Sequence, residues 1–163
     1  MFGYSLGLSS GRTTWEVETE LLGILGVRDL SEVPERWPAM TVSVEDREGM
    51  YQPGQEMYAE ELGTEVTTEI CYSIDNKTDW DEAARADVAM CVSAARLVDS
   101  IDATAVFFFQ SDRVIMRRVG DVLYLSGEWE LLWRNPDVLS RLPGTPVFSG
   151  DLDSMAPPQG WPI

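Results

Sequence analysis

One run of the chain concentrates uncompensated negative charge. The segment EMYAEELGTEVTTEI, residues 56–70, has five glutamates and no Lys, Arg or His. Carboxylates at this density attract cations or a basic protein surface, and a pair of them at a fixed separation can do general acid–base chemistry. The chain has too many carboxylates for the sequence to single out such a pair. For each glutamate, the competing interpretation is an ordinary solvated surface.

The whole chain has the same imbalance of charge. Its 163 residues include 28 Asp and Glu against 12 Lys and Arg, which gives a formal charge of −16. We therefore expect no nucleic acid and no anionic membrane as a partner, because both require clustered basic side chains. A basic partner, cations or plain solubility fit this charge. The 44% hydrophobic content indicates one globular domain with a core, not a disordered acidic tail.

The residue types for common nucleophilic and metal chemistry are scarce. The chain has no histidine, so it cannot form a Ser-His-Asp or Cys-His catalyst alone. Carboxylate, Lys or Tyr chemistry stays open. Cys71 and Cys91 form neither a zinc motif nor a CxxC pair, and we expect reduced thiols in or near the core, with a single disulfide as the alternative. We expect no catalytic residue, no metal and no cofactor.

The N-terminal residues and the hydropathy indicate where the protein acts. The first residues, MFGYSLGLSSGR, lack the basic region and the long apolar region of a signal peptide. No window of the chain approaches 18 apolar residues, so no transmembrane helix is expected. These features predict a cytoplasmic protein without a membrane partner.

Regular structure must position the acidic run, and its second half has the pattern of a strand. Apolar and polar side chains alternate in EVTTEICYSI, residues 65–74. We expect the apolar face to be buried, and Glu65 and Glu69 to face solvent. The two faces carry Val66, Thr68, Ile70, Tyr72 and Ile74 on one side, and Glu65, Thr67, Glu69, Cys71 and Ser73 on the other.

The segment before that strand lacks a clear pattern. Residues 47–63 contain three Gly and one Pro, and they predict a long connection or the ends of an irregular hairpin. Glu56, Glu60 and Glu61 then lie on a loop or a short helix that leads into the strand. The charges need no burial there, although crowded like charges repel one another.

Two helices are indicated by apolar residues at helical spacing. The first is capped by Thr13 or Thr14, with Glu16 placed as in a capping box, and ends at Gly26. The second begins after Thr78 or Asp79 and continues to about residue 100. Its apolar stripe is expected to pack on a sheet. The stripe consists of Ala84, Val88, Cys91, Val92, Ala95 and Val98.

Further strands are predicted at residues 2–9, 41–44 and, as a three-stranded meander, 103–126. The first strand of the meander has Phe107 and Phe109 on one face and Val106 and Phe108 on the other. Apolar side chains on both faces predict a central strand that is covered at least in part on both sides. The only basic cluster along the chain is expected to balance nearby acidic side chains. It consists of Arg113, Arg117 and Arg118.

The C-terminal part is predicted from Trp, Leu, Pro and Gly. GEWELLWRNPDVLSRLPG, residues 127–144, indicates a last helix that Pro136 interrupts, and residues 146–163 indicate a Pro/Gly-rich, poorly packed tail. The predicted order is β-α-β-β-α-β-β-β-α. This order predicts an α+β fold: a single domain over residues 1–145, with a mostly antiparallel sheet and two main helices packed on one face.

These segments resemble a known family in their order and in several local patterns. The patterns are YSLGLSS, a helix ending in LLGILG, then EVTTEICYSIDN, an Ala-rich helix, TAVFFFQSDRVIMRRVGDVLYLS and a closing Trp-Leu-rich segment. Together they are similar, over about residues 2–142, to the Sit-type (swarming-inhibition) immunity proteins of bacterial polymorphic toxin systems. The resemblance implies binding rather than catalysis, because each such protein neutralises a cognate toxin delivered by a competitor or sibling cell.

The resemblance brings no fixed functional residues, since the toxin-contacting surface varies with the toxin. The chain's own chemistry predicts an acidic surface that occludes a basic toxin cleft. A tight interface also needs an aromatic anchor, for which Tyr58 and the preceding Tyr51 are candidates. The expected partner-binding residues are Glu56, Tyr58, Glu60, Glu61, Glu65, Glu69, Asp75 and Asp79.

Two other functions fit the same composition. A non-catalytic adaptor or accessory binding module with a solvated acidic surface is the main alternative, and genomic position separates it from an immunity protein. An enzyme that uses paired carboxylates is the second alternative. It requires a cleft with two buried carboxylates whose pKa values are raised.

Overall fold

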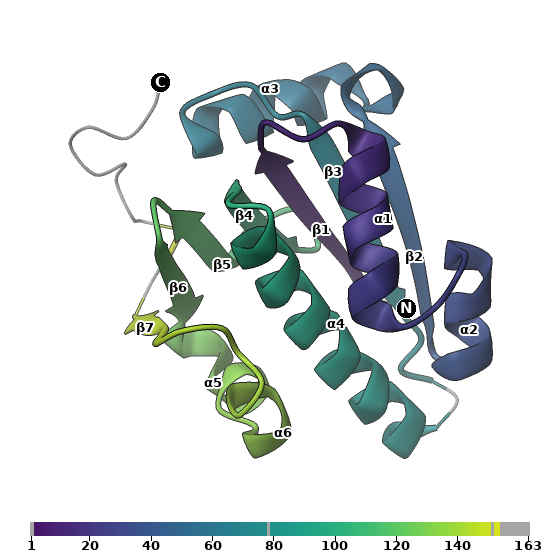
Figure 1. The fold of residues 1–163 in the computed structure, drawn as a ribbon. Helices are drawn as coiled ribbons and strands as arrows, with labels where there is room; N and C mark the ends of the chain where they lie inside the picture. Colours follow the sequence, from purple (N-terminus) through teal and green to yellow (C-terminus); the bar gives the residue numbers. More distant parts are fainter. Residues whose placement is uncertain (1, 78, 151, 154–163) are drawn as a thin grey trace.

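Strand β1 (Phe2–Ser9) lies inside a seven-stranded sheet, between β3 (Thr68–Ile74) and β4 (Thr104–Phe109). The structure is a computed structural model that describes residues 2–77, 79–150 and 152–153. The strand order is β2-β3-β1-β4-β5-β6-β7 (Figure 1). All neighbouring strands are antiparallel except β6 and β7, which are parallel. The predicted α+β fold with a mostly antiparallel sheet is confirmed.

The remaining elements connect and cover these strands. The other strands are β2 (Met40–Asp46), β5 (Arg113–Val119), β6 (Val122–Ser126) and β7 (Val147–Ser149). The helices are α1 (Thr14–Leu25), α2 (Val33–Arg36), α3 (Gln52–Leu62), α4 (Trp80–Ser100), α5 (Glu130–Trp133) and α6 (Pro136–Leu139). Short 3-10 turns are η1 (Leu30–Glu32), η2 (Arg47–Gly49) and η3 (Gly127–Trp129).

Helices α1 and α4 cover one face of the sheet, as predicted (Figure 1). Thr13 and Glu16 form the predicted capping box, and Gly26 ends α1 with φ 69°. Asp79 caps α4 by accepting from the backbone N–H groups of Asp81 and Glu82. The alternative cap, Thr78, lies outside the described residues.

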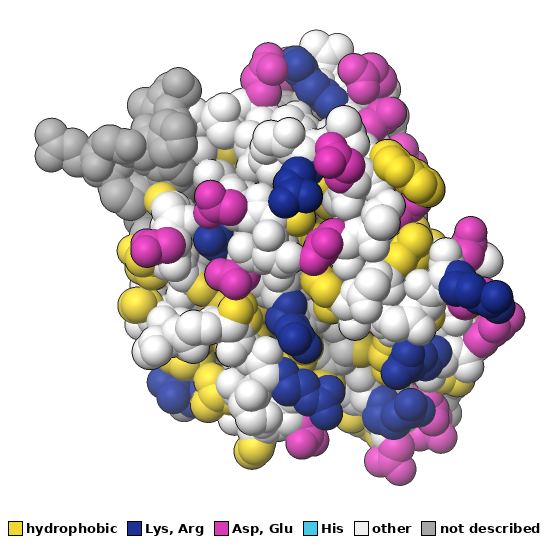
Figure 2. All heavy atoms as spheres, in the orientation of Figure 1, with side chains coloured by type: hydrophobic (Ala, Val, Ile, Leu, Met, Phe, Trp, Pro, Cys, Tyr) yellow, Lys and Arg dark blue, Asp and Glu magenta, His cyan; other side chains and the backbone are white. Residues whose placement is uncertain are grey.

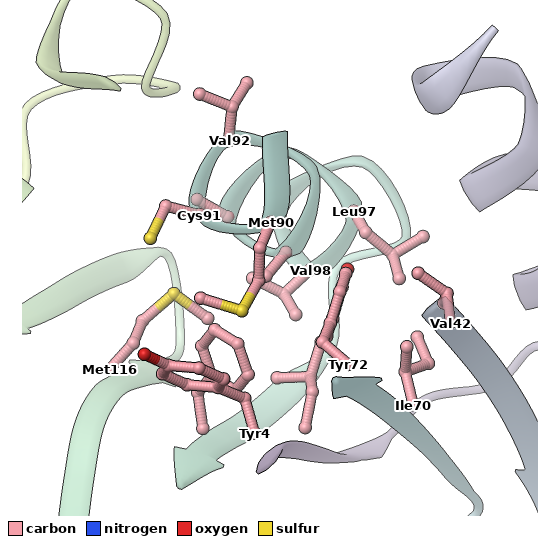
Figure 3. Packing of buried hydrophobic residues seen from close by; sticks show 14 of the residues in the cluster. Tyr4, Val42, Ile70, Tyr72, Met90, Cys91, Val92, Leu97, Val98 and Met116 are labelled. Atoms are coloured by element: carbon pink, nitrogen blue, oxygen red, sulfur yellow. The ribbon is translucent and has the colours of Figure 1, made fainter. Parts of the chain in front are cut away.

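The face of α4 that packs on the sheet differs from the predicted stripe. Met90 and Val98 point toward the sheet and its residues Tyr4 and Tyr72 (Figure 3). Val92 points away from the strands in the same view. The buried surface includes alanines that the stripe missed, whereas two members of the stripe, Ala84 and Val88, are exposed and half-buried. The alanines and Leu residues that complete the packed face are Ala83, Ala86, Ala94 and Leu97.

Residues 52–62 form helix α3, so of the alternatives for this segment (a long connection, an irregular hairpin, or a loop or short helix carrying Glu56, Glu60 and Glu61) the helix is the one found. Helix α3 has eleven residues and ends at Gly63, which has φ 71°. Pro53 lies in the first turn, where its missing N–H costs no helical hydrogen bond. Glycine inside a helix lowers helical stability, and Gly54 lowers it here. The helix forms because Tyr58 and Leu62 are buried against the sheet, and no local pattern reports that contact.

Helix α3 covers the second face of the sheet, opposite α1 and α4. Its buried residues join the alternate side chains of β4, Val106 and Phe108, in a smaller core. Phe107, between them, belongs to the larger core. The prediction that this central strand is covered on both faces is therefore confirmed. The smaller core consists of Met50, Tyr58, Leu62, Val66, Val106, Phe108, Val114 and Leu152.

The C-terminal segment joins the sheet through β7. The predicted last helix is two short helices, and Pro136 begins the second of them. Trp133 is fully buried and donates from Nε1 to the Ile115 carbonyl oxygen at 2.9 Å. Leu152 is also fully buried, so the described part of the expected tail is packed. The rest of that tail, 151 and 154–163, lies outside the described residues.

Both cysteines are free thiols, as predicted. Cys91, a residue of α4, is buried in the larger core. Cys71 lies on the face of β3 that points away from that core. Among the described helices, none combines the length and the apolar character that spanning a bilayer requires.

Candidate functional site

Exposed carboxylates gather where β2, α3 and the loop before β3 meet. Strand β2 pairs with β3 so that Asp46 lies opposite Thr68. Arg47, which follows β2, connects α3 with the loop before β3. Its Nη1 lies 2.9 Å from Glu65 Oε2, and its carbonyl oxygen accepts a hydrogen bond from Nε2 of Gln55 in α3. Arg47 also offsets one of the negative charges. We call this surface the acidic end, and its exposed carboxylates are Glu45, Asp46, Glu48, Glu56, Glu60 and Glu65.

The predicted alternation of buried and polar faces along residues 65–74 is correct, but Glu69 does not simply face solvent. It is half-buried and accepts a hydrogen bond from the Tyr58 hydroxyl at 2.6 Å. Burial raises the pKa of Tyr58, and the Glu69 carboxylate raises it further, so the phenol stays protonated. Burial and then Glu69 also raise the pKa of Cys71 to about 12, so this thiol is not activated as a nucleophile.

Tyr58 is not available as a surface anchor. Its ring is 1% exposed, packs near Phe108 and lies directly over Gly7. A β-carbon at Gly7 would overlap Cδ1 and Cε1 of that ring, so the missing side chain makes room for it. Tyr51, at the start of α3, is 79% exposed and is the aromatic side chain that this surface presents.

Glu61 also has an internal role. Its carboxylate pairs with Arg117, whose side chain is 2% exposed. The same guanidinium donates to the carbonyl oxygens of Glu61 and Leu152 at 3.2 and 3.3 Å. A buried guanidinium needs such partners, because an unpaired buried charge is strongly destabilising. Glu61 therefore holds α3 to β5.

Asp75 and Asp79 lie apart from the acidic end, at the other end of β3. A seven-residue strand is roughly 20 Å long, which gives the scale of the separation. Asp75 accepts from the Lys77 backbone N–H, and Asp79 caps α4. Of the eight predicted partner-binding residues, the structure brings Glu56, Glu60 and Glu65 together as exposed charges.

The basic cluster predicted to balance acidic side chains does so. Arg113 lies 3.2 Å from Glu128, and Arg118 lies 3.0 Å from Asp102. With the pair between Arg117 and Glu61, each of the three arginines has a carboxylate partner.

One half-buried carboxylate was not singled out by the sequence. Asp87 lines a cavity of about 650 Å³ between α4 and the segment 127–132, together with Tyr4, Glu128 and Trp129. Burial raises the pKa of Asp87 from its ordinary value of 3.8 to about 6. Glu128 is 44% exposed and paired with Arg113. Among the described residues, this cavity therefore holds one buried carboxylate and not the buried pair that the enzyme hypothesis requires.

No group of three or more His, Cys, Asp or Glu side chains suited to a metal ion occurs among the described residues.

In a comparison with known protein families, a model described as SitI3-like matches residues 2–137. The matched span includes β1 to β6 and the whole acidic end. Neither the curated proteins nor the solved structures that were compared include a match.

Proposed function

The chain belongs to the SitI3-like family, and from this premise we propose that it is an immunity protein that neutralises a cognate bacterial toxin by occluding it through the acidic end. Family membership agrees with the resemblance that the sequence indicates. The protein acts in the cytoplasm by binding, without a cofactor. Its partner is a protein toxin with a basic surface.

The observation that carries this proposal is the way the acidic end is built. Glu56 and Glu60 project from α3, and α3 is held to the sheet by Tyr58, Leu62 and the pair of Glu61 with Arg117. The exposed charges therefore lie on a rigid support, which lowers the conformational entropy lost on binding. A rigid array of like charges raises the rate of encounter with an oppositely charged surface.

Tyr51 supplies the aromatic contact that charge alone lacks. It lies one residue before α3, next to the acidic end, and is 79% exposed. Aromatic side chains contribute much of the affinity at the centre of interfaces, while charged side chains at the rim mainly affect the association rate. We expect Tyr51→Ala to raise the dissociation rate and charge reversals to lower the association rate.

The test is co-expression with the toxin gene immediately upstream. Growth is compared with the toxin alone, with the toxin and this protein, and with two triple variants. The first, Glu56→Lys, Glu60→Lys and Glu65→Lys, reverses the acidic end. The matched control changes the net charge equally at exposed sites elsewhere: Glu35→Lys, Asp112→Lys and Asp121→Lys.

The expected result is rescue by the native chain and the control, with a stable complex on gel filtration. The first triple variant should associate at least about tenfold more slowly at low salt, because it replaces attraction with repulsion at three positions. A toxin that the native chain does not relieve would refute the immunity role. Equal association rates for the two triple variants would refute the acidic end as the interface and leave the immunity role standing.

A further inference from the structure

A second charged surface lies on the opposite side of the molecule from α3. It is an open groove of about 550 Å³ along the outer side of α4. One wall consists of the end of α1 with Arg36 of α2 and the following Trp37. The other wall consists of α6 and Arg141. In Figure 1, α4 lies between α1 and α2 on one side and α5 and α6 on the other.

The floor of this groove is apolar. It is formed by Ala84, Val88, Ala89 and Val92 of α4 with Ile24 and Leu25 of α1. In α4 these residues recur at helical spacing on the side directly opposite the face that packs on the sheet. Val92 is seen pointing away from the strands in Figure 3. The helix is therefore apolar on two opposite sides, which is typical of a helix covered on both.

The two ends of that floor carry positive charge. Arg85 and Arg96 of α4 both line the groove. They are eleven residues apart, which is three helical turns or about 16 Å on the same side of the helix. The walls add Arg36 and Arg141. The groove thus has four of the chain's twelve basic residues, whereas Asp137 is the one acidic residue among the described residues that line it.

Two of these four arginines have partners within the protein, and two have side chains that can pair with a ligand. Arg36 donates to the carbonyl oxygens of Leu25 and Gly26, and its guanidinium lies 5.0 Å from the Trp37 ring centre. Arg85 pairs with Glu82 at 2.9 Å. Within the described part of the chain, Arg96 and Arg141 have neither an ion pair nor a hydrogen bond from the side chain. Figure 2 shows Lys and Arg side chains gathering over the lower half of this face, around α4 and the segments beside it.

We propose that this groove binds an amphipathic helix of a partner protein that carries Asp or Glu beside its apolar side chains. The apolar side of the helix covers Val88 and Ala89, and its carboxylates reach Arg85, Arg96 and Arg141. Helix-in-groove binding of this kind buries the floor side chains that stay at least partly exposed, Ile24, Ala84, Val88 and Ala89, whereas Val92 and Leu25 are already buried. The inference does not depend on the proposed function, because it concerns another surface and the opposite charge.

Other occupants fit the groove less well. A nucleic acid would place phosphates over an apolar floor and would be repelled by the net charge of −16. A second copy of the chain carries the same net charge, so its approach is opposed at long range. An acidic helix meets the same long-range repulsion, but the groove offers it both apolar contact and local positive charge.

The experiment uses the full chain and a fluorescein-labelled synthetic helix of about 16 residues, a length at which an isolated helix becomes stable enough to use. The peptide has Leu at i, i+4 and i+7 with Glu at the flanking positions. Two matched peptides replace either Leu by Ser or Glu by Lys. Fluorescence anisotropy gives the Kd, and amide chemical shifts locate the site. A single-stranded oligonucleotide with the same label tests the nucleic-acid alternative.

Of the three peptides and the oligonucleotide, we expect the acidic Leu peptide alone to bind. The changes in amide chemical shift should be confined to residues that line the groove, including Val88 and Val92. The variant R96E/R141E should raise the Kd about tenfold, because two attractions become repulsions. The control R12E/R28E makes the same change in net charge at exposed sites that do not line the groove. Equal losses in the two variants, shifts elsewhere, preference for the oligonucleotide, or no binding near 1 mM would each overturn the proposal.

Discussion

The sheet face beneath α1 and α4 and the sheet face beneath α3 are covered by different means. Under α1 and α4, apolar side chains such as Leu21, Met90 and Phe107 form a continuous core. Under α3, a small core of eight residues is supplemented by polar contacts, which are the Tyr58 hydroxyl with Glu69 and Glu61 with Arg117. Both faces therefore combine burial with polar contacts. On the first face the hydroxyls of Tyr72 and Ser93 of α4 lie 3.0 Å apart, whereas the second adds the ion pair of Glu61 with buried Arg117.

The outer surfaces of these layers differ as well. The outer surface of α3 carries the acidic end, and the outer surface of α4 carries the arginine groove. The sheet separates them, so opposite charges lie on opposite sides of one small protein. Charges that share a surface reinforce each other in attracting a partner. Under the two proposals, the basic surface and the acidic helix would bind on separate sides of the chain and would not compete.

The largest expected effect tests the core beneath α4. Phe107→Ala should lower the free energy of unfolding by about 3–5 kcal/mol, because Phe107 is fully buried in the larger core and leaves a cavity. Phe108→Ala, on the α3 side, should cost less, about 2–3 kcal/mol, since the smaller core can collapse more easily. Urea denaturation of both variants measures the difference. A larger loss for Phe108→Ala would reverse the ranking of the two faces.

A smaller effect tests the polar attachment of α3. Glu61→Ala should lower the free energy of unfolding by up to about 3 kcal/mol, because the buried Arg117 guanidinium loses the Glu61 carboxylate. Glu60→Ala, one residue away and exposed, should change it by less than about 0.5 kcal/mol. Thermal denaturation followed by circular dichroism checks both. Equal effects would show that the pair does not hold α3.

Gly7→Ala should cost about 1–3 kcal/mol, because the added methyl group overlaps the Tyr58 ring. Combining it with Tyr58→Leu, which shortens the side chain, should give a double variant whose loss is smaller than the sum of the two single losses. Additive losses in this double-mutant cycle would indicate that Gly7 does not accommodate Tyr58.

The smallest effect concerns a carboxylate on the α4 side. The folded protein raises the pKa of Asp87 from 3.8 to about 6, so folding favours its protonated form. Its stabilising contribution is present below pH 3.8 and is lost as the pH rises through 6. Asp87→Asn should therefore match the native chain near pH 4 and exceed it by on the order of 1 kcal/mol at pH 7.5, a value reduced for partial exposure.

Denaturation of Asp87→Asn and the native chain at a series of pH values measures this difference. Asp121→Asn, which removes one charge from an exposed carboxylate at the turn between β5 and β6, serves as the matched control. A stability difference that does not vary between pH 4 and 7.5 would contradict the burial of Asp87.

The sequence predicted the face beneath α1 and α4 because its signals are local. Each of these signals can be read within a stretch of at most ten residues. They are the alternation in residues 2–9 and 65–74, the capping box at Thr13 and the helix-ending Gly26. Helix α3 lacks such signals. It has no side-chain cap, and it contains Gly54, so its formation depends on contacts of Tyr58 and Leu62 with distant strands. Burial of Tyr58 also requires Gly7, fifty-one residues earlier in the chain.

The acidic end could be predicted in part and the groove could not, because only the former has a local signal in the sequence. Half of the acidic end, Glu56, Glu60 and Glu65, lies in the acidic run of residues 56–70, so part of its charge is visible without the fold. The groove combines Arg36, Arg85, Arg96 and Arg141, and only the packing of α1, α4 and α6 brings them together. The predicted apolar stripe of α4 was a partial signal, because it included Ala84, Val88 and Val92 from the outer side.

The position of β1 at the centre of the sheet affects how the chain folds during synthesis. Strand β1 leaves the ribosome first, but its partners β3 and β4 begin at Thr68 and Thr104. About 95 residues separate the end of β1 from the start of β4, and at bacterial rates of translation this takes roughly 5 to 20 s. Until β4 is synthesised, the hydrogen-bonding groups on the β4 side of β1 have no partner strand, although β3 is available earlier on the other side. We therefore expect an N-terminal tag that engages β1 before β4 is synthesised to lower the yield of folded protein.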